Sequence, residues 1–178
     1  MRRVLFAVVA LSATLVAGCD DAGASPAAQT STAPAAVAGG ACQLLDFGMV
    51  NAKLGLNLSV AAGASMDNSF SCVLETAATH YPDLVLSVSA TTVGPDIVAS
   101  VVQPKDAVAV PGLGVTGYQM PTPEAGGAGP GVEVGWLAGN KRIINLSLRL
   151  APGTPEDKAV QVMPKLVELA RLIDLSSL

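Results

Sequence analysis

The sequence predicts an α+β fold in which helices pack on an antiparallel sheet. Residues 84–92 and 132–150 alternate apolar and polar side chains, as strands with one buried face do. Residues 155–173 carry an apolar stripe at helical spacing. We therefore expect an antiparallel sheet packed by a short N-terminal helix, a short middle helix and a long C-terminal helix.

The N-terminus predicts export followed by lipid attachment. Two arginines, Arg2 and Arg3, precede an uncharged run of 14 residues over 4–17, shorter than the ~20 residues of a membrane-spanning helix. The end of this run and the two residues after it read LVAGC, residues 15–19, which resembles the bacterial lipobox. In a lipobox the signal is cut just before the cysteine, here between Gly18 and Cys19, and the cysteine is lipidated. We expect residues 1–18 to be a signal peptide and Cys19 to carry diacylglyceryl and palmitate-type chains. A plain secretion signal is the alternative, and the export route is open.

Composition separates a linker from a domain. Residues 19–41 consist mainly of Ala, Gly, Ser, Thr and Pro, which predicts a lipidated N-terminus and a disordered linker. Residues 42–178 then form a single α+β domain. The formal charge is −4, and losing Arg2 and Arg3 lowers it to −6, which argues against a nucleic-acid partner. With Cys19 lipidated, Cys42 and Cys72 are expected to form a disulfide; two buried free thiols are the alternative.

Local signals place the elements of this domain. Asp46 and Gly55 are suited to cap a helix over 47–54. A strand is expected over 69–76, a short helix over 97–102 and a short strand over 107–110. The last helix is expected to begin with Thr154 as its N-cap and to kink at Pro164.

The segment 132–150 predicts a β-hairpin with one apolar face on each strand. A three-residue loop over 138–140 would bring the two faces together, whereas a two-residue turn would separate them. The three-residue loop pairs Leu137 with Lys141, places Arg142 opposite Trp136 and puts Asn140 near a left-handed conformation.

These motifs resemble an uncharacterised family of secreted and lipoprotein domains common in actinobacteria. The likeness covers 42–178 and rests on CQLL at 42–45, Gly55, Cys72, VPGLG at 110–114 and the helix over 155–173. Val73 and Leu74 follow the second cysteine, where the family often has tryptophan. The resemblance implies a disulfide-bonded envelope domain and no particular activity.

No motif in the chain predicts catalysis. Gly112, Gly114 and Gly117 match G-x-G-x-x-G, but the prolines that follow exclude the helix that a dinucleotide site requires. His80 is the single histidine and is expected in an exposed turn. We therefore expect no catalytic, metal or cofactor residues, and a non-enzymatic, membrane-anchored lipoprotein on the extracytoplasmic face that binds an envelope protein or ligand. The alternatives are a carrier with an apolar cavity between helix and sheet, and a carboxylate-based hydrolase.

Overall fold

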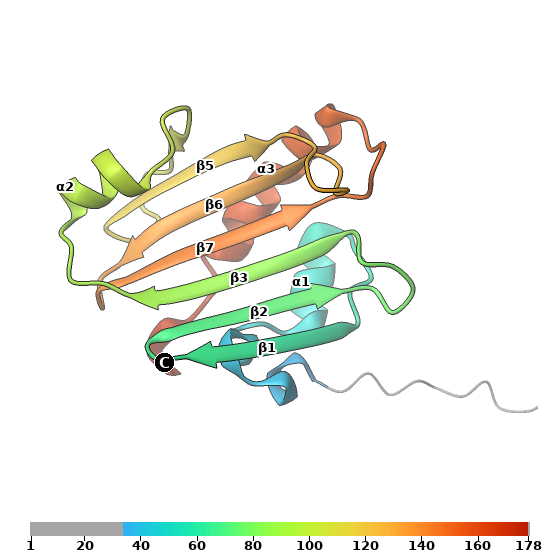
Figure 1. Ribbon diagram of the computed structural model, residues 1–178, viewed down its shortest axis with the longest axis horizontal. Coiled ribbons are helices and arrows are strands. Elements are labelled where there is room, and N and C mark those ends of the chain that lie inside the picture. The colour runs from blue at the N-terminus through green and yellow to red at the C-terminus, as the bar shows by residue number, and fades with distance from the viewer. Residues whose placement is uncertain (1–33, 178) are drawn as a thin grey trace, which may run out of the picture. The chain divides into compact units, whose positions relative to one another are not determined.

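The computed structural model describes residues 34–177, in which the N-terminal and C-terminal helices cover one side of an antiparallel sheet (Figure 1). Seven strands follow the order β1-β2-β3-β7-β6-β5-β4. They are β1 (Val60–Met66), β2 (Ser69–Glu75), β3 (Asp83–Ala90), β4 (Val108–Ala109), β5 (Thr116–Thr122), β6 (Gly131–Ala138) and β7 (Arg142–Arg149). The signal peptide, Cys19 and the first part of the expected linker lie outside the described residues.

Three α-helices and four other helical turns complete this part of the chain. The helices are α1 (Phe47–Leu54), α2 (Pro95–Ile97) and α3 (Glu156–Ala170). The 3-10 turns are η1 (Ala35–Ala38), η2 (Gly40–Leu44) and η4 (Leu175–Ser177), and α2 continues into the π-helical turn η3 (Val98–Val102). The expected α+β class, with short, short and long helices, is confirmed.

The hydrophobic core lies between α1, α3 and one face of the sheet. Alternate residues of the central strands point into it, including Leu86 of β3 and Leu146 of β7, and both are fully buried. Leu166 and Leu169 of α3 fill the space opposite them. Burial of each such side chain contributes about 1.5–3 kcal/mol, so this apolar layer stabilises the fold.

Helix α1 forms as its capping residues predict. The Asp46 carboxylate accepts a hydrogen bond from the Met49 N–H at 2.9 Å. Gly55 ends the helix with φ 72°, a left-handed conformation that glycine adopts without strain. Val50 and Leu54 are buried on the face that meets the core.

The packed structure begins before residue 42, which corrects the expected linker boundary. Ala35 in η1 and Ala41 in η2 are buried in the core, so residues 35–41 are part of the fold. Alanine and glycine let this segment lie close to the sheet: a Cβ on Gly40 would come within 2.6 Å of the carbonyl oxygens of Ala64 and Ser71. Small residues, typical of linkers, are here required for packing.

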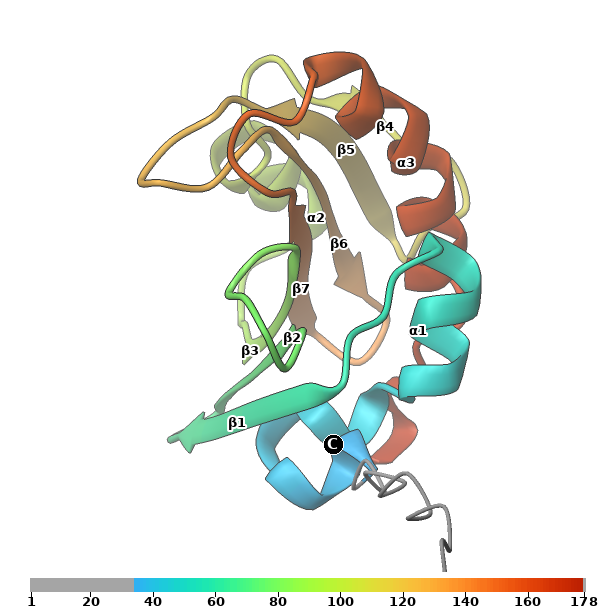
Figure 2. The same ribbon diagram turned by 90° about the vertical axis from the view of Figure 1, so that its right-hand side faces the viewer.

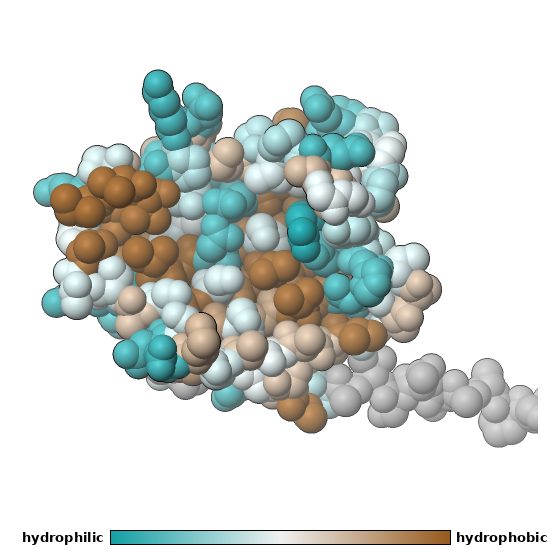
Figure 3. Space-filling model, viewed as in Figure 1, coloured by the Kyte–Doolittle hydropathy of each residue, from teal (hydrophilic) through white to brown (hydrophobic). Residues whose placement is uncertain are grey.

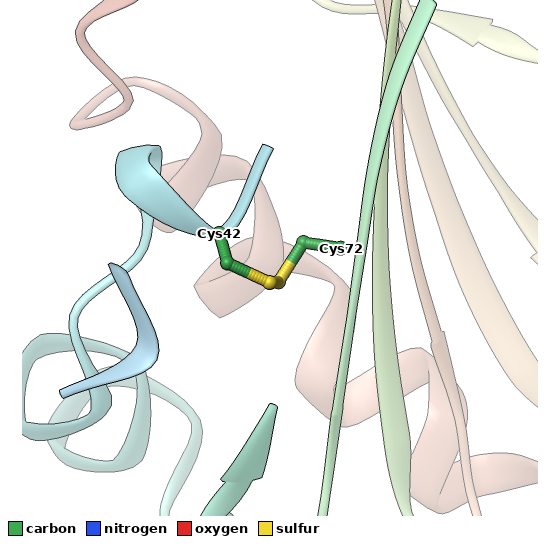
Figure 4. Close-up of a disulfide and its surroundings, with 2 residues drawn as sticks. All are labelled: Cys42 and Cys72. Carbon is green, nitrogen blue, oxygen red and sulfur yellow. A yellow bond between two sulfur atoms is a disulfide. The ribbon is translucent and has the colours of Figure 1, made fainter. Parts of the chain in front are cut away.

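The disulfide between Cys42 and Cys72 is present (Figure 4). It joins η2 to β2 with a Cα–Cα distance of 4.8 Å, and both residues are fully buried. The alternative of two free thiols is therefore wrong for this structure.

Strands β1 and β5 were not expected from the sequence. The β1 residues VAAGASM are nearly all small and exposed, so they lack the alternation that marks a strand. Strand β5 contains Pro121, which lacks an N–H. Strand β4 pairs only with Tyr118 and Gln119, so Pro121 lies where β5 has no neighbour on that side.

The hairpin of β6 and β7 has the expected faces in a different register. Trp136 pairs with Ile144 and Ala138 with Arg142, so the three-residue loop is 139–141, one residue later than expected. The left-handed residue is Lys141, with φ 58°, and not Asn140. Moving the loop by one residue shifts the strand pairing by two residues, so every side chain keeps its expected face. Arg142 therefore lies not opposite Trp136 but 5.7 Å from the centre of the Phe70 ring.

Helix α3 begins without the expected cap and continues through Pro164. The Thr154 hydroxyl donates to the carbonyl of Ala151 at 2.6 Å, so it stabilises the preceding turn and does not cap the helix. Pro155 occupies the N-cap position, and the buried residues of α3 include Ala159, Leu166 and Ala170 from the expected stripe.

Removing the disulfide should strongly destabilise the fold. The cysteines are 30 residues apart, and the chain-entropy model gives about 3.6 kcal/mol for closing such a loop. We expect Cys42→Ala/Cys72→Ala to lower the free energy of unfolding by about that amount in urea denaturation. Reductant should destabilise the parent chain and leave the double variant unchanged. An equal effect of reductant on both proteins would contradict this prediction.

Candidate functional site

The sheet face opposite α1 and α3 is the candidate functional surface. No helix layer covers most of it, and the sheet curves so that this open face is concave (Figure 2). Strand register places Ser71, Ser87, Asn145 and Tyr118 in one row across it. The floor therefore combines small polar side chains with one aromatic ring, unlike the apolar face beneath the helices.

Segment α2–η3 roofs one end of the open face. Leu137 and Tyr118 point to this face by register, yet both are buried and lie outside the main core. Val98 of η3 is also buried outside that core, and α2 lies on the same side of the sheet (Figure 2). The burial of these three residues shows that this end of the open face is covered.

The outer side of α2–η3 exposes a large apolar patch. Ile97 is 49% exposed and Val101 is 73% exposed, with Val93 and Val102 beside them in the chain. Figure 3 shows this hydrophobic area at the α2 end of the open face. We call Val93, Ile97, Val101 and Val102 the valine patch. Contiguous exposed apolar surface of this kind marks interaction sites in soluble domains.

Tyr118 is the centre of a polar contact on the floor. Its hydroxyl donates to the Glu133 carboxylate at 2.8 Å. Gly135, its partner on β6, makes room for the ring, because a Cβ there would overlap the ring atoms of Tyr118. Burial raises the pKa of Tyr118 well above its ordinary value, and the hydrogen bond and negative charge of Glu133 add to this, while Asn145 opposes it. The phenol therefore remains a neutral hydrogen-bond donor.

A second polar contact lies at the end of β3 and β7 remote from α2. Asp83 is buried, and Arg149 beside it donates two hydrogen bonds to its carboxylate, one of them from Nε at 3.0 Å. The hydrogen bond to Asp83 raises the pKa of Arg149. The guanidinium also lies 5.5 Å from the centre of the Tyr81 ring. Arg149 thus compensates a buried charge and remains half exposed toward the open face.

A hollow of about 290 Å³ connects these polar groups. Glu133, Ser147 and Arg149 line its floor, and the loop over 123–130 forms its wall. Glu133 and Arg149 are diagonal neighbours on adjacent strands and form no ion pair with each other. A polar group of a binding partner could therefore contact both charges there.

The centre of the space between α3 and the sheet is filled. Leu146, Leu166 and Leu169 fill it and are fully buried. At its rim a hollow of about 260 Å³, lined by Pro121, Pro130 and Val160 among others, opens to the surface.

The histidine and the glycines considered in the sequence analysis lie in a loop and a turn of the structure. His80 is exposed in the loop between β2 and β3, with Nδ1 3.5 Å from a Glu75 oxygen. Gly112 and Gly114 lie in the turn before β5 with positive φ, and a strand follows in place of a helix. In residues 34–177 no three His, Cys, Asp or Glu side chains gather to hold a metal ion.

Comparison with known proteins adds no assignment. No protein-family model matches the chain, and neither curated proteins nor solved structures give a significant match. Within the described part, no helix is long and apolar enough to cross a membrane.

Sequence reasoning missed the valine patch and the Tyr118–Glu133 pair. The density of valine and isoleucine over 93–102 was visible, but such residues usually indicate core. Only the folded structure shows which side of the segment is exposed.

Tyr118 should make stability decrease at alkaline pH. An unfolded tyrosine ionises near pH ~10, whereas folded Tyr118 keeps its proton because its pKa is raised. The unfolded state then binds fewer protons than the folded state, so the free energy of unfolding falls as pH rises above ~10. We expect Tyr118→Phe to reduce this fall in urea denaturation at pH 8 and pH 11, and Tyr81→Phe to retain it. An identical pH dependence in wild type and Tyr118→Phe would contradict the role of this phenol.

Proposed function

We propose that this chain is a lipid-anchored envelope protein that binds another envelope protein through the valine patch and the adjoining open sheet face. The lipobox at 15–19 supports the anchor, and the buried disulfide suits an oxidising extracytoplasmic compartment. The single observation that carries the binding role is the valine patch.

The exposure of apolar side chains on a surface helix indicates that the valine patch binds a partner. A helix on a protein surface normally buries one apolar side and presents polar residues to water on the other. Val98 is buried against the domain, while Ile97 and Val101 on the outer side face water. A partner that covers them would remove this apolar area from water, at about 25 cal/mol per Å² buried.

The chemistry of the patch favours a protein partner over the membrane surface. Residues 93–103 contain one charged residue, Asp96, and no Lys, Arg, Trp or Phe. Helices that lie in the membrane interface generally use basic residues and large aromatic or leucine side chains. Valine and isoleucine with an acidic neighbour match an apolar protein surface better.

The polar groups of the open face support binding over catalysis. Tyr118 donates to Glu133, and Arg149 is held by Asp83. These pairs are suited to give specificity through hydrogen bonds at the rim of an apolar contact. The filled space between α3 and the sheet gives no support to a carrier with an internal cavity.

The anchor is tested by Cys19→Ala. We expect this substitution to abolish the lipid-modified N-terminal peptide in mass spectrometry and to release the protein from the detergent-soluble membrane fraction. Cys42→Ala/Cys72→Ala should retain the lipid, because it leaves Cys19 in place and removes only the other two cysteines. Unchanged processing and membrane association of Cys19→Ala would contradict lipidation.

The binding surface is tested by site-specific photocrosslinking in native membranes. A crosslinking amino acid at Val101 should form adducts of discrete mass, and Ile97→Ser/Val102→Ser should abolish them because the apolar contact is lost. The same crosslinker at Val160, which is 56% exposed on α3, is the matched control and should give none of these adducts. Identical adducts from both positions, or adducts with lipid alone, would contradict the proposal.

A further inference from the structure

The two edges of the sheet differ in how well they are protected. Strand β4, at one edge, has only two residues, Val108 and Ala109. Strand β1, at the other edge, has seven residues, and all but Ala61 are exposed. Natural proteins usually protect a long edge with charges or prolines, because its unpaired backbone groups can pair with another strand. Strand β1 contains neither, and residues 35–40 pack against it from the helix-covered side, where Ala38 and Gly39 lie over Gly63.

The free backbone groups of β1 can be assigned from the pairing pattern. The N–H of Ala90 donates to the carbonyl of Asn68 at 3.1 Å. Asn68 and the even-numbered residues of β2 therefore direct their N–H and C=O groups toward β3. The odd-numbered residues of β2 direct theirs toward β1, where their partners are the even-numbered residues of β1. The N–H and C=O groups of Ala61, Gly63 and Ser65 therefore point away from the sheet. Among residues 34–177, these groups make no backbone hydrogen bond outside the strands.

We propose that β1 pairs with β1 of a second copy of this chain, antiparallel and centred on Gly63. In this register Ala62 lies opposite Ala64, Ala61 opposite Ser65, and Val60 opposite Met66. The outward groups of 61, 63 and 65 then meet their own counterparts, as a two-fold symmetric interface requires. Every opposed pair is small or apolar, and no charge faces a like charge. This self-complementarity argues for a second copy over an unrelated strand.

The symmetry also agrees with two anchors in one membrane. Edge-to-edge pairing has its two-fold axis perpendicular to the sheet, so the helix-covered faces of both copies lie on the same side. The chain passes over β1 on that side, since a Cβ on Gly63 would meet the carbonyl oxygens of Ala38 and Gly39. Pairing of seven residues is a small interface, so it is weak in dilute solution. Confinement to a membrane, which rests on the proposed lipidation, raises the effective concentration.

Cysteine crosslinking tests the register in the full-length chain in membranes. Ala62 and Ala64 of facing copies form a non-hydrogen-bonded pair, where cross-strand side chains are closest. Ala62→Cys/Ala64→Cys should give a covalent dimer on mild oxidation that reductant reverses. Ala62→Cys/Met66→Cys is the matched control on the same edge and face. It should give several-fold less dimer, because the proposed register opposes neither cysteine to the other.

A charge test separates β1 pairing from other contacts and from the anchor. Val60→Cys/Met66→Cys should also form a covalent dimer, and adding A62K and A64K should abolish it by opposing lysines. V108K on β4 should leave it unchanged. The same variants combined with Cys19→Ala, at high protein concentration, test pairing without the lipid. Equal crosslinking of the 62/64 and 62/66 pairs, no dimer from 62/64, or a dimer that persists after A62K and A64K would overturn the proposal.

Discussion

The attachment of the N-terminal segment to the sheet is the constraint on which this fold depends. Residues 35–44 pass over β1 and β2, and the disulfide fixes the segment to β2 at Cys72. The segment can approach only because Gly40 and Gly63 lack side chains at the crossing. It closes the core beside α1, since Ala41, Cys42 and Leu44 are all buried. Chain entry, covalent link and core closure are therefore one structural unit.

This arrangement places α1 and α3 on one face of the sheet and leaves most of the other face to polar contacts, with α2–η3 covering only one end of it. On the covered face, fully buried leucines supply the hydrophobic stabilisation. On the open face, Asp83–Arg149 and Tyr118–Glu133 satisfy groups that would otherwise be buried without partners. The same pairs bring charge and hydrogen-bonding capacity to a concave surface, so the features that make this face stable also suit it to recognition.

Local chemistry made part of the fold predictable from sequence. Asp46 and Gly55 bound α1 because capping depends on residues close in the chain. The faces of β6 and β7 were predictable from alternation, but the register was not, because a shift of two residues leaves the faces unchanged. Strand β1 escaped detection because its small residues pack against the N-terminal segment through glycine and not through an apolar stripe. The open face depends on pairs such as Tyr118 and Glu133, which only strand pairing brings together.

The two surfaces proposed for association lie in different parts of the sheet and do not compete. Strand β1 forms one edge, whereas α2–η3 connects β3 to β4 and lies over one end of the open face (Figure 2). Pairing through β1 uses backbone groups in the plane of the sheet, while the valine patch uses side chains above it. A dimer formed through β1 would therefore present two free valine patches. A partner that carries two matching sites would bind such a dimer more tightly than a single copy, because the second contact forms at high effective concentration.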